Sequence, residues 1–307
     1  MHSQPLVTIA IPAYKADFLR EAISSALNQS YSNIELIVVD DSSPENIDDI
    51  VKEFNDFRIR YYRNKENIGA KDPSINWNKC LEYAKGVFFA LLCDDDTYEP
   101  TFVEKMLELA NAYSNVKVFR ARAKTIDDKN HTVNWYPSAP AFETGFDYMY
   151  QKLSGFRRQT ISEFLYRTDY IRELGGYTNM PRAWTSDSLS IFKFAWENGI
   201  ASVPTILVNF RESSKNISSI YSDVLKKRDA LIFFKSSIEC YIESTPDINQ
   251  KKILSDSLYY CLYREITSLC AKSSFFNIFR ILLKGGFPRK WALFIFAKKI
   301  GNLGKKL

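Results

Sequence analysis

The sequence predicts an α/β protein in which helices flank a mostly parallel sheet and a helical extension follows. Over the first hundred residues, short apolar runs rich in β-branched residues alternate with amphipathic stretches. Strands that alternate with helices at this spacing pair in parallel through right-handed crossovers. After residue 212 the strand-like runs stop and the pattern becomes helical. We therefore place a domain boundary near residue 212.

Each expected element has its own pattern. An expected strand is a continuous apolar run, typical of a strand covered on both faces, and an expected helix carries its apolar residues on one stripe. The expected strands lie at 6–12, 34–39, 59–62, 87–92, 116–124 and 201–208. The expected helices lie at 17–28, 45–54, 74–84, 101–113 and 186–198. We expect 126–156 to be irregular, and long irregular segments often line sites.

The composition excludes several classes of protein. Of 307 residues, 46% are hydrophobic and 15% aromatic, which is typical of a globular chain with a large core. The longest apolar run, at 291–297, is far shorter than the roughly 20 residues that span a bilayer. The only histidines are His2 and His131, which excludes a two-histidine metal site. The five cysteines have no C-x-x-C spacing and follow no secretory leader, so we expect a cytoplasmic protein.

The net charge of +5 comes from the C-terminal tail. Positions 275–307 hold eight Lys or Arg residues and no Asp or Glu, which leaves 33 basic and 36 acidic residues in 1–274. Basic and apolar residues in two short helices are typical of a segment that binds an anionic membrane surface, here the inner face of the cell membrane. The alternative is that the tail packs on the protein or on a second subunit. We expect no nucleic-acid binding.

Aspartates follow two of the expected parallel strands at the point where each strand ends. They are Asp40 and Asp41 after the second strand, and Asp94, Asp95 and Asp96 after the fourth. Ligands bind beyond this edge of a parallel sheet, and five carboxylates there need a cation or hydrogen-bond donors. No G-x-G-x-x-G or Walker A loop is present, so a nucleoside diphosphate held through Mn²⁺ or Mg²⁺ is the expected ligand. A helix-capping turn and a solvated turn are the structural alternatives.

Several segments between residues 5 and 212 form a specific combined pattern. They are Val7–Tyr14, Ala22–Tyr31, Glu35–Ser43, Asn67–Gly69, Asn78, Asp94–Asp96, Pro100, Leu174–Tyr177 and Asp187. Together they resemble the family 2 inverting glycosyltransferases with the GT-A fold, such as those of bacterial polysaccharide and spore-coat polysaccharide synthesis.

The resemblance implies a GT-A catalytic domain at 1–212 and a helical extension at 213–307. Within the domain, 1–100 would bind the nucleotide and 101–212 the acceptor. The implied activity is metal-dependent transfer of a sugar, with inversion, from a nucleoside diphosphate donor, expected to be a UDP-sugar. The acceptor would be a saccharide or a lipid-linked saccharide of a bacterial surface polysaccharide. The sequence leaves the oligomeric state open.

The resemblance also assigns residues to the donor. It places Pro12, Ala13 and Tyr14 against the base and ribose, and Asp41 on the base. In the Asp-rich turn it places Asp94 near the ribose.

Two departures from the family pattern affect the metal and the phosphates. Cys93 stands where the first aspartate of the turn is usual, so we expect Asp96 to share the metal with Asp95. Trp77 stands where many relatives carry an arginine, and Lys71 is the candidate for the missing phosphate-facing cation.

An inverting transfer needs a base, because the attacking hydroxyl must lose its proton. The resemblance places this base at Asp187, at the start of the helix 186–198; helix capping is the alternative. For the acceptor we expect Arg157 and Arg158 to meet a pyrophosphate group. The aromatic residues expected to stack on sugar faces are Trp135, Tyr136, Phe142, Phe146 and Tyr148.

Two other functions remain as alternatives. A sugar-nucleotide nucleotidyltransferase would need a Gly-rich loop with Arg or Lys after the first strand, which 13–17 does not offer. A catalytically silent membrane-associated assembly protein with the same fold is supported by the departures at Cys93 and Trp77. Binding of a nucleoside diphosphate with metal discriminates between the enzyme and the silent protein.

Overall fold

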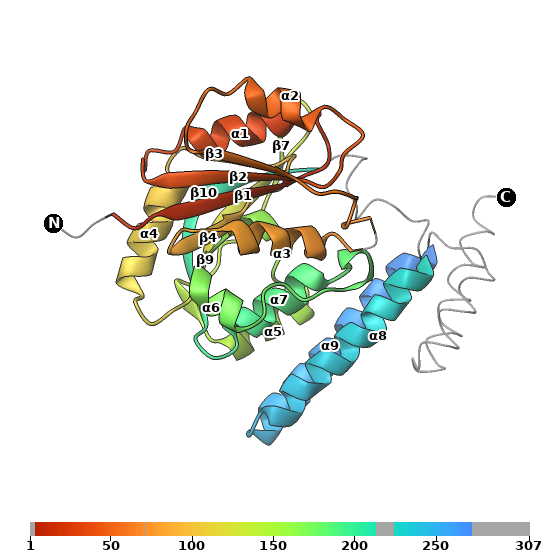
Figure 1. Cartoon of the computed structure of the whole chain (residues 1–307). Helices are drawn as coiled ribbons and strands as arrows, with labels where there is room; N and C mark the ends of the chain where they lie inside the picture. Colours follow the sequence, from red (N-terminus) through yellow and green to blue (C-terminus); the bar gives the residue numbers. More distant parts are fainter. Residues whose placement is uncertain (1–3, 71, 213–223, 272–307) are drawn as a thin grey trace. The chain divides into compact units, whose positions relative to one another are not determined.

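The computed structural model describes residues 4–70, 72–212 and 224–271 (Figure 1). The described residues form two compact units. The first comprises those of Met1–Tyr148, Arg157–Asn179 and Ser186–Ser213, and the second those of Met149–Phe156, Met180–Thr185 and Ser214–Leu307. The expected nucleotide-binding residue Lys71 and the basic tail at 275–307 lie outside the described residues.

Ten strands of the described residues form one sheet in the first unit. Their order is β3-β2-β1-β4-β9-β6-β10-β5, with β7 beside β6 and β8 beside β10. The strands are β1 (Val7–Ala13), β2 (Ile34–Asp40), β3 (Ile59–Arg63), β4 (Phe88–Leu91), β5 (Thr97–Tyr98), β6 (Val118–Ile126), β7 (Thr132–Trp135), β8 (Phe142–Glu143), β9 (Phe164–Arg167) and β10 (Ile200–Arg211).

The direction of the strands positions the site. β3, β2, β1 and β4 pair in parallel, and β6 pairs in parallel with β10. Between these two groups β9 runs antiparallel to both β4 and β6. The start of β9 therefore lies at the carboxyl end of β4, and residues just before β9 reach the edge where the parallel strands end.

Helices connect the strands and flank the sheet (Figure 1). They are α1 (Leu19–Leu27), α2 (Ile47–Lys52), α3 (Ser74–Tyr83), α4 (Phe102–Ala112), α5 (Gly145–Leu153), α6 (Thr168–Glu173) and α7 (Ser186–Ala195), with short 3₁₀ turns η1 (Ile161–Glu163) and η2 (Pro181–Ala183). In the second unit α8 (Val224–Ser244) and α9 (Ile248–Ala271) lie side by side. No helix among the described residues is long and apolar enough to cross a membrane.

The predicted α/β class and mostly parallel sheet agree with this architecture, but one expectation was wrong. The stretch 126–156 was expected to be irregular and instead contains β7, β8 and α5. All four residues of β7 are exposed, because it is an outer strand that pairs with β6 alone. An exposed edge strand has no buried face, so no apolar pattern marks it in the sequence.

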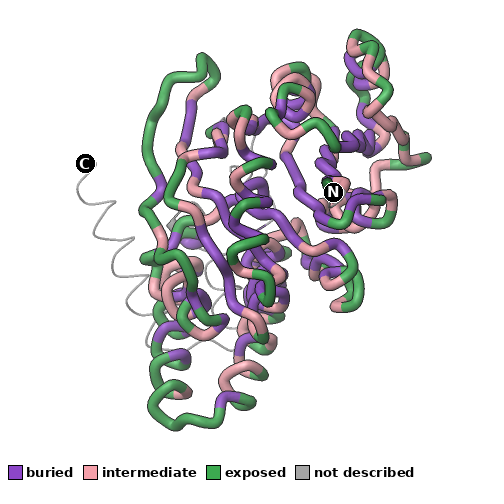
Figure 2. The backbone as a smooth tube through the Cα atoms, turned by 90° about the vertical axis from the view of Figure 1, so that its left-hand side faces the viewer, coloured by how far each residue is buried: buried purple, intermediate pink, exposed green. Residues whose placement is uncertain are grey.

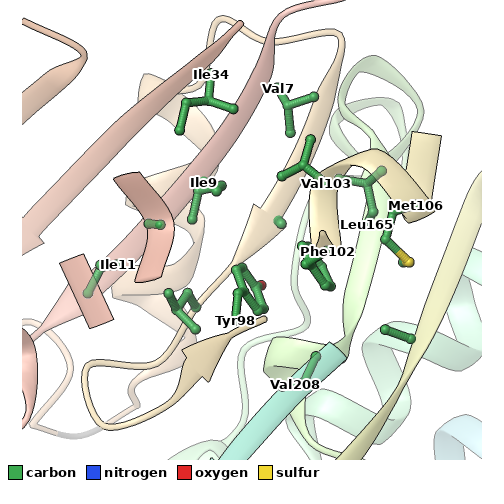
Figure 3. Close-up of a cluster of buried hydrophobic side chains, with 14 of the residues drawn as sticks. Val7, Ile9, Ile11, Ile34, Tyr98, Phe102, Val103, Met106, Leu165 and Val208 are labelled. Carbon is green, nitrogen blue, oxygen red and sulfur yellow. The ribbon is translucent and has the colours of Figure 1, made fainter. Parts of the chain in front are cut away.

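The hydrophobic core fixes the end of β4. The central strands are buried along their length (Figure 2), and all seven residues of β2 are buried. Side chains of β1 face those of α4 and β5 in one cluster (Figure 3). Within it the Tyr98 ring stacks on Phe102 at 3.8 Å, and the Tyr98 hydroxyl donates to the carbonyls of Leu91, at 3.3 Å, or Ser162, at 2.9 Å. The turn at 93–96 therefore leaves a rigid strand from a fixed point.

Candidate active site

The ends of β1, β2 and β4 meet at one edge of the sheet. The backbone N–H of Asp41 donates to the Ala13 carbonyl at 2.9 Å, and that of Leu92 donates to the Ala10 carbonyl at 2.9 Å. The two predicted aspartate clusters thus follow β2 and β4, the two strands that flank β1. This is the edge at which parallel α/β sheets bind ligands.

Asp94 is held by the loop that follows β1. Its Oδ2 accepts hydrogen bonds from the backbone N–H groups of Tyr14 and Lys15, both at 2.8 Å. The carboxylate is buried, and burial raises its pKa while the nearby Lys15 ammonium lowers it. The end of β1 and the Asp-rich turn are therefore locked together by backbone donors.

Lys15 is a site residue that the sequence analysis missed. Its ammonium contacts the carboxylate of Asp95 and lies 3.4 Å from Asp94 Oδ1. Burial opposes the charge on this ammonium, yet Asp94 and Asp95 hold its pKa above the usual range. The signal available in the sequence was its place next to Tyr14 at the end of the first strand.

Both carboxylate oxygens of Asp96 accept hydrogen bonds from neighbouring segments. Oδ2 accepts the Ser162 hydroxyl at 2.6 Å, and Oδ1 accepts the backbone N–H of Arg211 at 2.9 Å. The residue has no exposed surface. Burial, together with the neighbouring Asp95, raises the pKa of Asp96 to about 8. Its predicted role as a metal ligand stays a prediction, and the hydrogen bonds show a structural role.

Two carboxylates at this turn fit a hard divalent cation, whereas the sulfur beside them is a softer ligand. The Cys93 sulfur and one carboxylate oxygen each of Asp95 and Asp96 lie within 4.8 Å of one another. The Lys15 ammonium on Asp94 and Asp95 shows that these carboxylates accept a positive charge. Mg²⁺ and Mn²⁺ sites often use one or two protein carboxylates plus substrate phosphates. The roles of Asp95 and Asp96 as metal ligands stay predictions; of the two, Asp95 also pairs with Lys15.

Asp41 binds the loop that precedes α3. Its Oδ1 accepts the Asn64 amide at 2.8 Å and the backbone N–H of Ile68 at 3.0 Å, and its Oδ2 accepts the backbone N–H of Gly69 at 2.7 Å. A Cβ added at Gly69 would stand 2.6 Å from Asp41 Oδ2. A carboxylate has about four acceptor positions, so Oδ2 keeps one for a ligand. The contact of Asp41 with a base stays a prediction.

Asp40 is structural, in contrast to its neighbour. It has no exposed surface, and its carboxylate accepts bonds from the Ser43 backbone N–H at 2.8 Å and the Tyr61 hydroxyl at 2.7 Å, besides an ion pair with Arg63. Burial, with the hydrogen bond to Asp40, raises the pKa of Tyr61 to about 12.

The remaining residues predicted to bind the nucleotide lie at the end of β1. Ala13 is buried, and Pro12 is half-buried. Tyr14 is 42% exposed, and its carbonyl accepts the Ser43 hydroxyl at 2.6 Å. The exposed ring of Tyr14 is the surface there that a base could contact.

Asp187 is the second residue of α7 and is half-buried. Its Oδ2 accepts the side-chain amide of Gln159 at 3.0 Å, and its Oδ1 lies 3.5 Å from the Ser188 hydroxyl. The hydrogen bonds described for its carboxylate thus come from side chains, not from the first N–H groups of the helix. Its role as the base stays a prediction. Gln159 was not expected from the sequence.

The residues predicted to bind the acceptor have different surroundings. Trp135 is 59% exposed, with the Arg122 guanidinium 5.8 Å from its ring, and the exposed Arg158 lies 5.3 Å over the Tyr136 ring. Arg157 is only 7% exposed and forms an ion pair with Glu143.

Two of the aromatic residues expected to stack on sugars, Tyr136 and Tyr148, are instead buried. The expectation failed for them because aromatic rings are core residues more often than ligand platforms.

A mostly parallel sheet, with β9 antiparallel between its two parallel groups and an Asp-rich turn after its fourth strand, agrees with the GT-A class of nucleotide-sugar transferases that the sequence resembles. The model of glycosyl transferase family 2 matches residues 8–175, and the chain belongs to this family. The predicted family and enzyme class are confirmed.

Named relatives match between about a third and two fifths of the chain. The putative teichuronic acid biosynthesis glycosyltransferase TuaG of Bacillus subtilis is 37% identical over 108 residues, which are 34% of this chain and 42% of TuaG. The UDP-Glc:alpha-D-GlcNAc-diphosphoundecaprenol beta-1,3-glucosyltransferase WfgD of Escherichia coli is 38% identical over 105 residues, 34% of this chain and 40% of WfgD. An uncharacterized glycosyltransferase of Rickettsia typhi is 37% identical over 131 residues, 42% of this chain and 40% of that protein. The match thus spans about two fifths of each relative.

Solved structures match almost the whole chain. S. aureus TarS in complex with UDP-GlcNAc has a TM-score of 0.73 at 16% identity, over 97% of this chain and 89% of that one. The mannosyltransferase PcManGT from Pyrobaculum calidifontis, in complex with GDP-Man and Mn²⁺, has a TM-score of 0.59 at 15% identity, over 100% of this chain and 89% of that one. These likenesses confirm the predicted GT-A fold.

Proposed function

We propose that this glycosyltransferase transfers a sugar, with inversion, from a UDP-sugar to a saccharide or lipid-linked acceptor in the synthesis of a bacterial surface polysaccharide. One observation carries the proposal: Asp94 and Asp95 are fixed against the end of β1. The family supports the transfer of a sugar, and the name of WfgD, with UDP-Glc and a diphosphoundecaprenol-linked acceptor, supports this choice of donor and acceptor.

The donor would lie across the ends of β1 and β4. Tyr14 offers an exposed ring for the base, and Asp41 Oδ2 has an acceptor position left for a base N–H. Asp94 lies beside Tyr14 and would face the ribose. The complex of TarS with UDP-GlcNAc supports a uridine nucleotide in this fold.

The cofactor in this proposal is Mn²⁺ or Mg²⁺, held chiefly by Asp95, with Asp96 as the weaker second ligand because both of its oxygens are already hydrogen-bonded. When bound, the ion offsets the negative charge that develops on the departing diphosphate. The complex of PcManGT with Mn²⁺ supports a divalent ion in this fold. The Lys15 ammonium neutralises Asp95 and Asp94 when no other cation does.

Asp187 would take the proton. As the acceptor hydroxyl oxygen bonds to the anomeric carbon of the donor, its proton passes to the Asp187 carboxylate. The bond between that carbon and the diphosphate oxygen breaks with its electron pair on the diphosphate. A single displacement of this kind inverts the anomeric configuration. Trp135, Arg157 and Arg158 remain the proposed acceptor residues, with Trp135 and Arg158 the exposed ones.

The proposed location is the cytoplasm, at the inner face of the cell membrane, where a lipid-linked acceptor would be found. The composition of the tail at 275–307, with eight basic residues and no acidic ones, supports attraction to an anionic surface.

Thermal unfolding of the full chain with a panel of nucleotide-sugars, with and without Mn²⁺, tests the proposal. A ligand that binds the native state raises the unfolding temperature by mass action. We expect a rise with a UDP-sugar that depends on Mn²⁺. Absence of a rise with every nucleoside diphosphate would favour the silent assembly protein. A rise only with a nucleoside triphosphate would favour a nucleotidyltransferase.

A further inference from the structure

A chain of two hydrogen bonds ends on the Asp187 carboxylate. The Gln159 amide nitrogen donates to Asp187 Oδ2 at 3.0 Å, and the Gln159 amide oxygen accepts the Tyr148 hydroxyl at 2.6 Å. The three residues come from different segments: Tyr148 from α5, Gln159 from the loop before η1, and Asp187 from α7. We propose that Gln159, oriented by Tyr148, is a positioning residue that aims the Asp187 carboxylate at the acceptor hydroxyl. This proposal rests on the proposed function.

The chain can run in one direction only. An ionised carboxylate has no hydrogen to donate, so Gln159 must present its nitrogen to Asp187 and its oxygen to Tyr148. The phenol must then donate. Burial raises the pKa of the Tyr148 hydroxyl above its usual range, so this hydroxyl keeps its proton. The orientation of the Gln159 amide is thereby determined at both ends.

Tyr148 is a rigid anchor for this chain. The residue has no exposed surface. Its ring packs edge-on against Phe192 of α7 at 6.2 Å between centroids, and the Arg120 guanidinium lies 5.9 Å from it. Arg120 is itself buried and forms an ion pair with Glu163 at 2.8 Å. The orientation of Gln159 therefore depends on the packed core and not on solvent.

Gln159 links the base to the donor edge, a name we use for the ends of β1, β2 and β4 with Asp41, Asp94, Asp95 and Asp96. Gln159 lies three positions before Ser162, whose hydroxyl donates to Asp96 at 2.6 Å. Since β9 is antiparallel to β4, this segment lies at the carboxyl end of β4. The same segment thus contacts the Asp-rich turn at Ser162 and the base at Gln159. Oδ2 of Asp187 is engaged by Gln159 at 3.0 Å, whereas Oδ1 has only the longer contact of 3.5 Å with the Ser188 hydroxyl, so we assign Oδ1 to the acceptor proton.

The test compares four variants of the full chain, two test variants and two controls, for transfer, UDP binding and thermal unfolding. Gln159→Leu removes the donor to Asp187, and we expect kcat to fall by about 10-fold to 100-fold, part of the 10²–10⁴ that a general base contributes. Tyr148→Phe removes only the hydroxyl, and we expect a smaller fall. UDP affinity should stay within about twofold in both, because neither residue contacts the proposed nucleotide site. Gln151→Leu and Tyr150→Phe are matched controls from the same part of the chain, expected to retain activity.

A double-mutant cycle separates positioning from a structural role. Asp187→Asn removes the base, and only the residual transfer that does not depend on it should remain. In the Asp187→Asn background, adding Gln159→Leu should cost no further activity, because Gln159 acts through Asp187. An additional loss of the same size as in the wild type, or a parallel loss of UDP binding, would overturn the inference. If Asp187→Asn itself leaves transfer unchanged, the proposed function fails at its base. If only Gln159→Leu leaves transfer unchanged, the positioning role alone fails.

Discussion

The donor edge and the proposed base hold their carboxylates in different ways. At the donor edge, Asp41 and Asp94 each accept two backbone N–H groups. The hydrogen bond to Asp187 Oδ2 comes instead from one side-chain amide, that of Gln159. Backbone donors are fixed by the strands and loops that carry them, whereas a side-chain amide keeps its orientation only while its own partner does. The strands and loops therefore position the carboxylates of the donor edge, whereas packed side chains position the carboxylate of the base.

The largest effect in this comparison is expected at the donor edge, from Asp95→Asn. The amide lacks the charge that would hold a cation on the turn, so Mn²⁺-dependent transfer should fall by about 10²-fold or more, the scale of losing one electrostatic stabiliser. Steady-state kinetics over a Mn²⁺ titration measures the effect. Asp49→Asn changes an exposed aspartate of α2 and is the matched control. Unchanged turnover of Asp95→Asn would remove the metal assignment.

A second prediction concerns Gly69, whose backbone N–H donates to the Asp41 carboxylate. The Cβ of Gly69→Ala would stand 2.6 Å from Asp41 Oδ2, so the loop must shift. An inserted methyl group in packed surroundings costs about 1–3 kcal/mol, and UDP binding should weaken by about tenfold in calorimetry.

Gly175→Ala is the control for Gly69→Ala. Gly175 has a φ of +78° and open space around its Cβ position. An alanine there strains the backbone at a position away from Asp41. We therefore expect lower stability but unchanged UDP affinity. Equal UDP affinity in Gly69→Ala and the wild type would show that the loop does not shape the base site.

A third prediction concerns the Lys15 ammonium at the donor edge. Lys15→Met keeps the length of the side chain but removes the ammonium from Asp95 and Asp94. Metal-free protein should lose about 1–3 kcal/mol of stability, because a buried charge loses its partner. Mn²⁺ should bind several-fold more tightly, since it no longer competes with the ammonium. Electron paramagnetic resonance of free Mn²⁺ measures the affinity; weaker Mn²⁺ binding in the variant would contradict competition.

The smallest effect is expected from Asp96→Asn. An asparagine at this position can accept the Arg211 N–H on its oxygen and donate from its nitrogen to Ser162 Oγ, so a hydrogen bond remains at each end, the second with its direction reversed. We expect kcat within about threefold of the wild type, since a fully paired replacement is nearly neutral. A loss as large as that of Asp95→Asn would instead make Asp96 an essential metal ligand, as the sequence analysis expected.

The sequence predicts the donor edge better than the base. Apolar runs marked β1, β2 and β4, and their ends brought the five aspartates to one edge of the sheet. Which aspartates also bond to the core was not predictable, because it depends on side-chain direction: Asp40 accepts the Tyr61 hydroxyl and Asp96 the Ser162 hydroxyl.

The hydrogen bond between Gln159 and Asp187 could not be predicted from the sequence, for a different reason. Gln159 and Asp187 are 28 positions apart, in segments whose proximity depends on how η1 and α7 pack. Tyr148 looked like an acceptor platform because burial of an aromatic residue on α5 has no local signal. The exposed strand β7 was missed because an edge strand needs no apolar alternation.

The central claim is that this edge binds a UDP-sugar with a divalent ion and that Asp187 removes the acceptor proton. Calorimetric titration of UDP with Mn²⁺ into the wild type and Asp187→Asn, paired with transfer assays on the same samples, tests it most directly. We predict equal affinity for UDP in both proteins and a loss of transfer of about 10²-fold or more in Asp187→Asn, the contribution of a general base. Transfer at the wild-type rate by Asp187→Asn, or no UDP binding by either protein, would contradict the account.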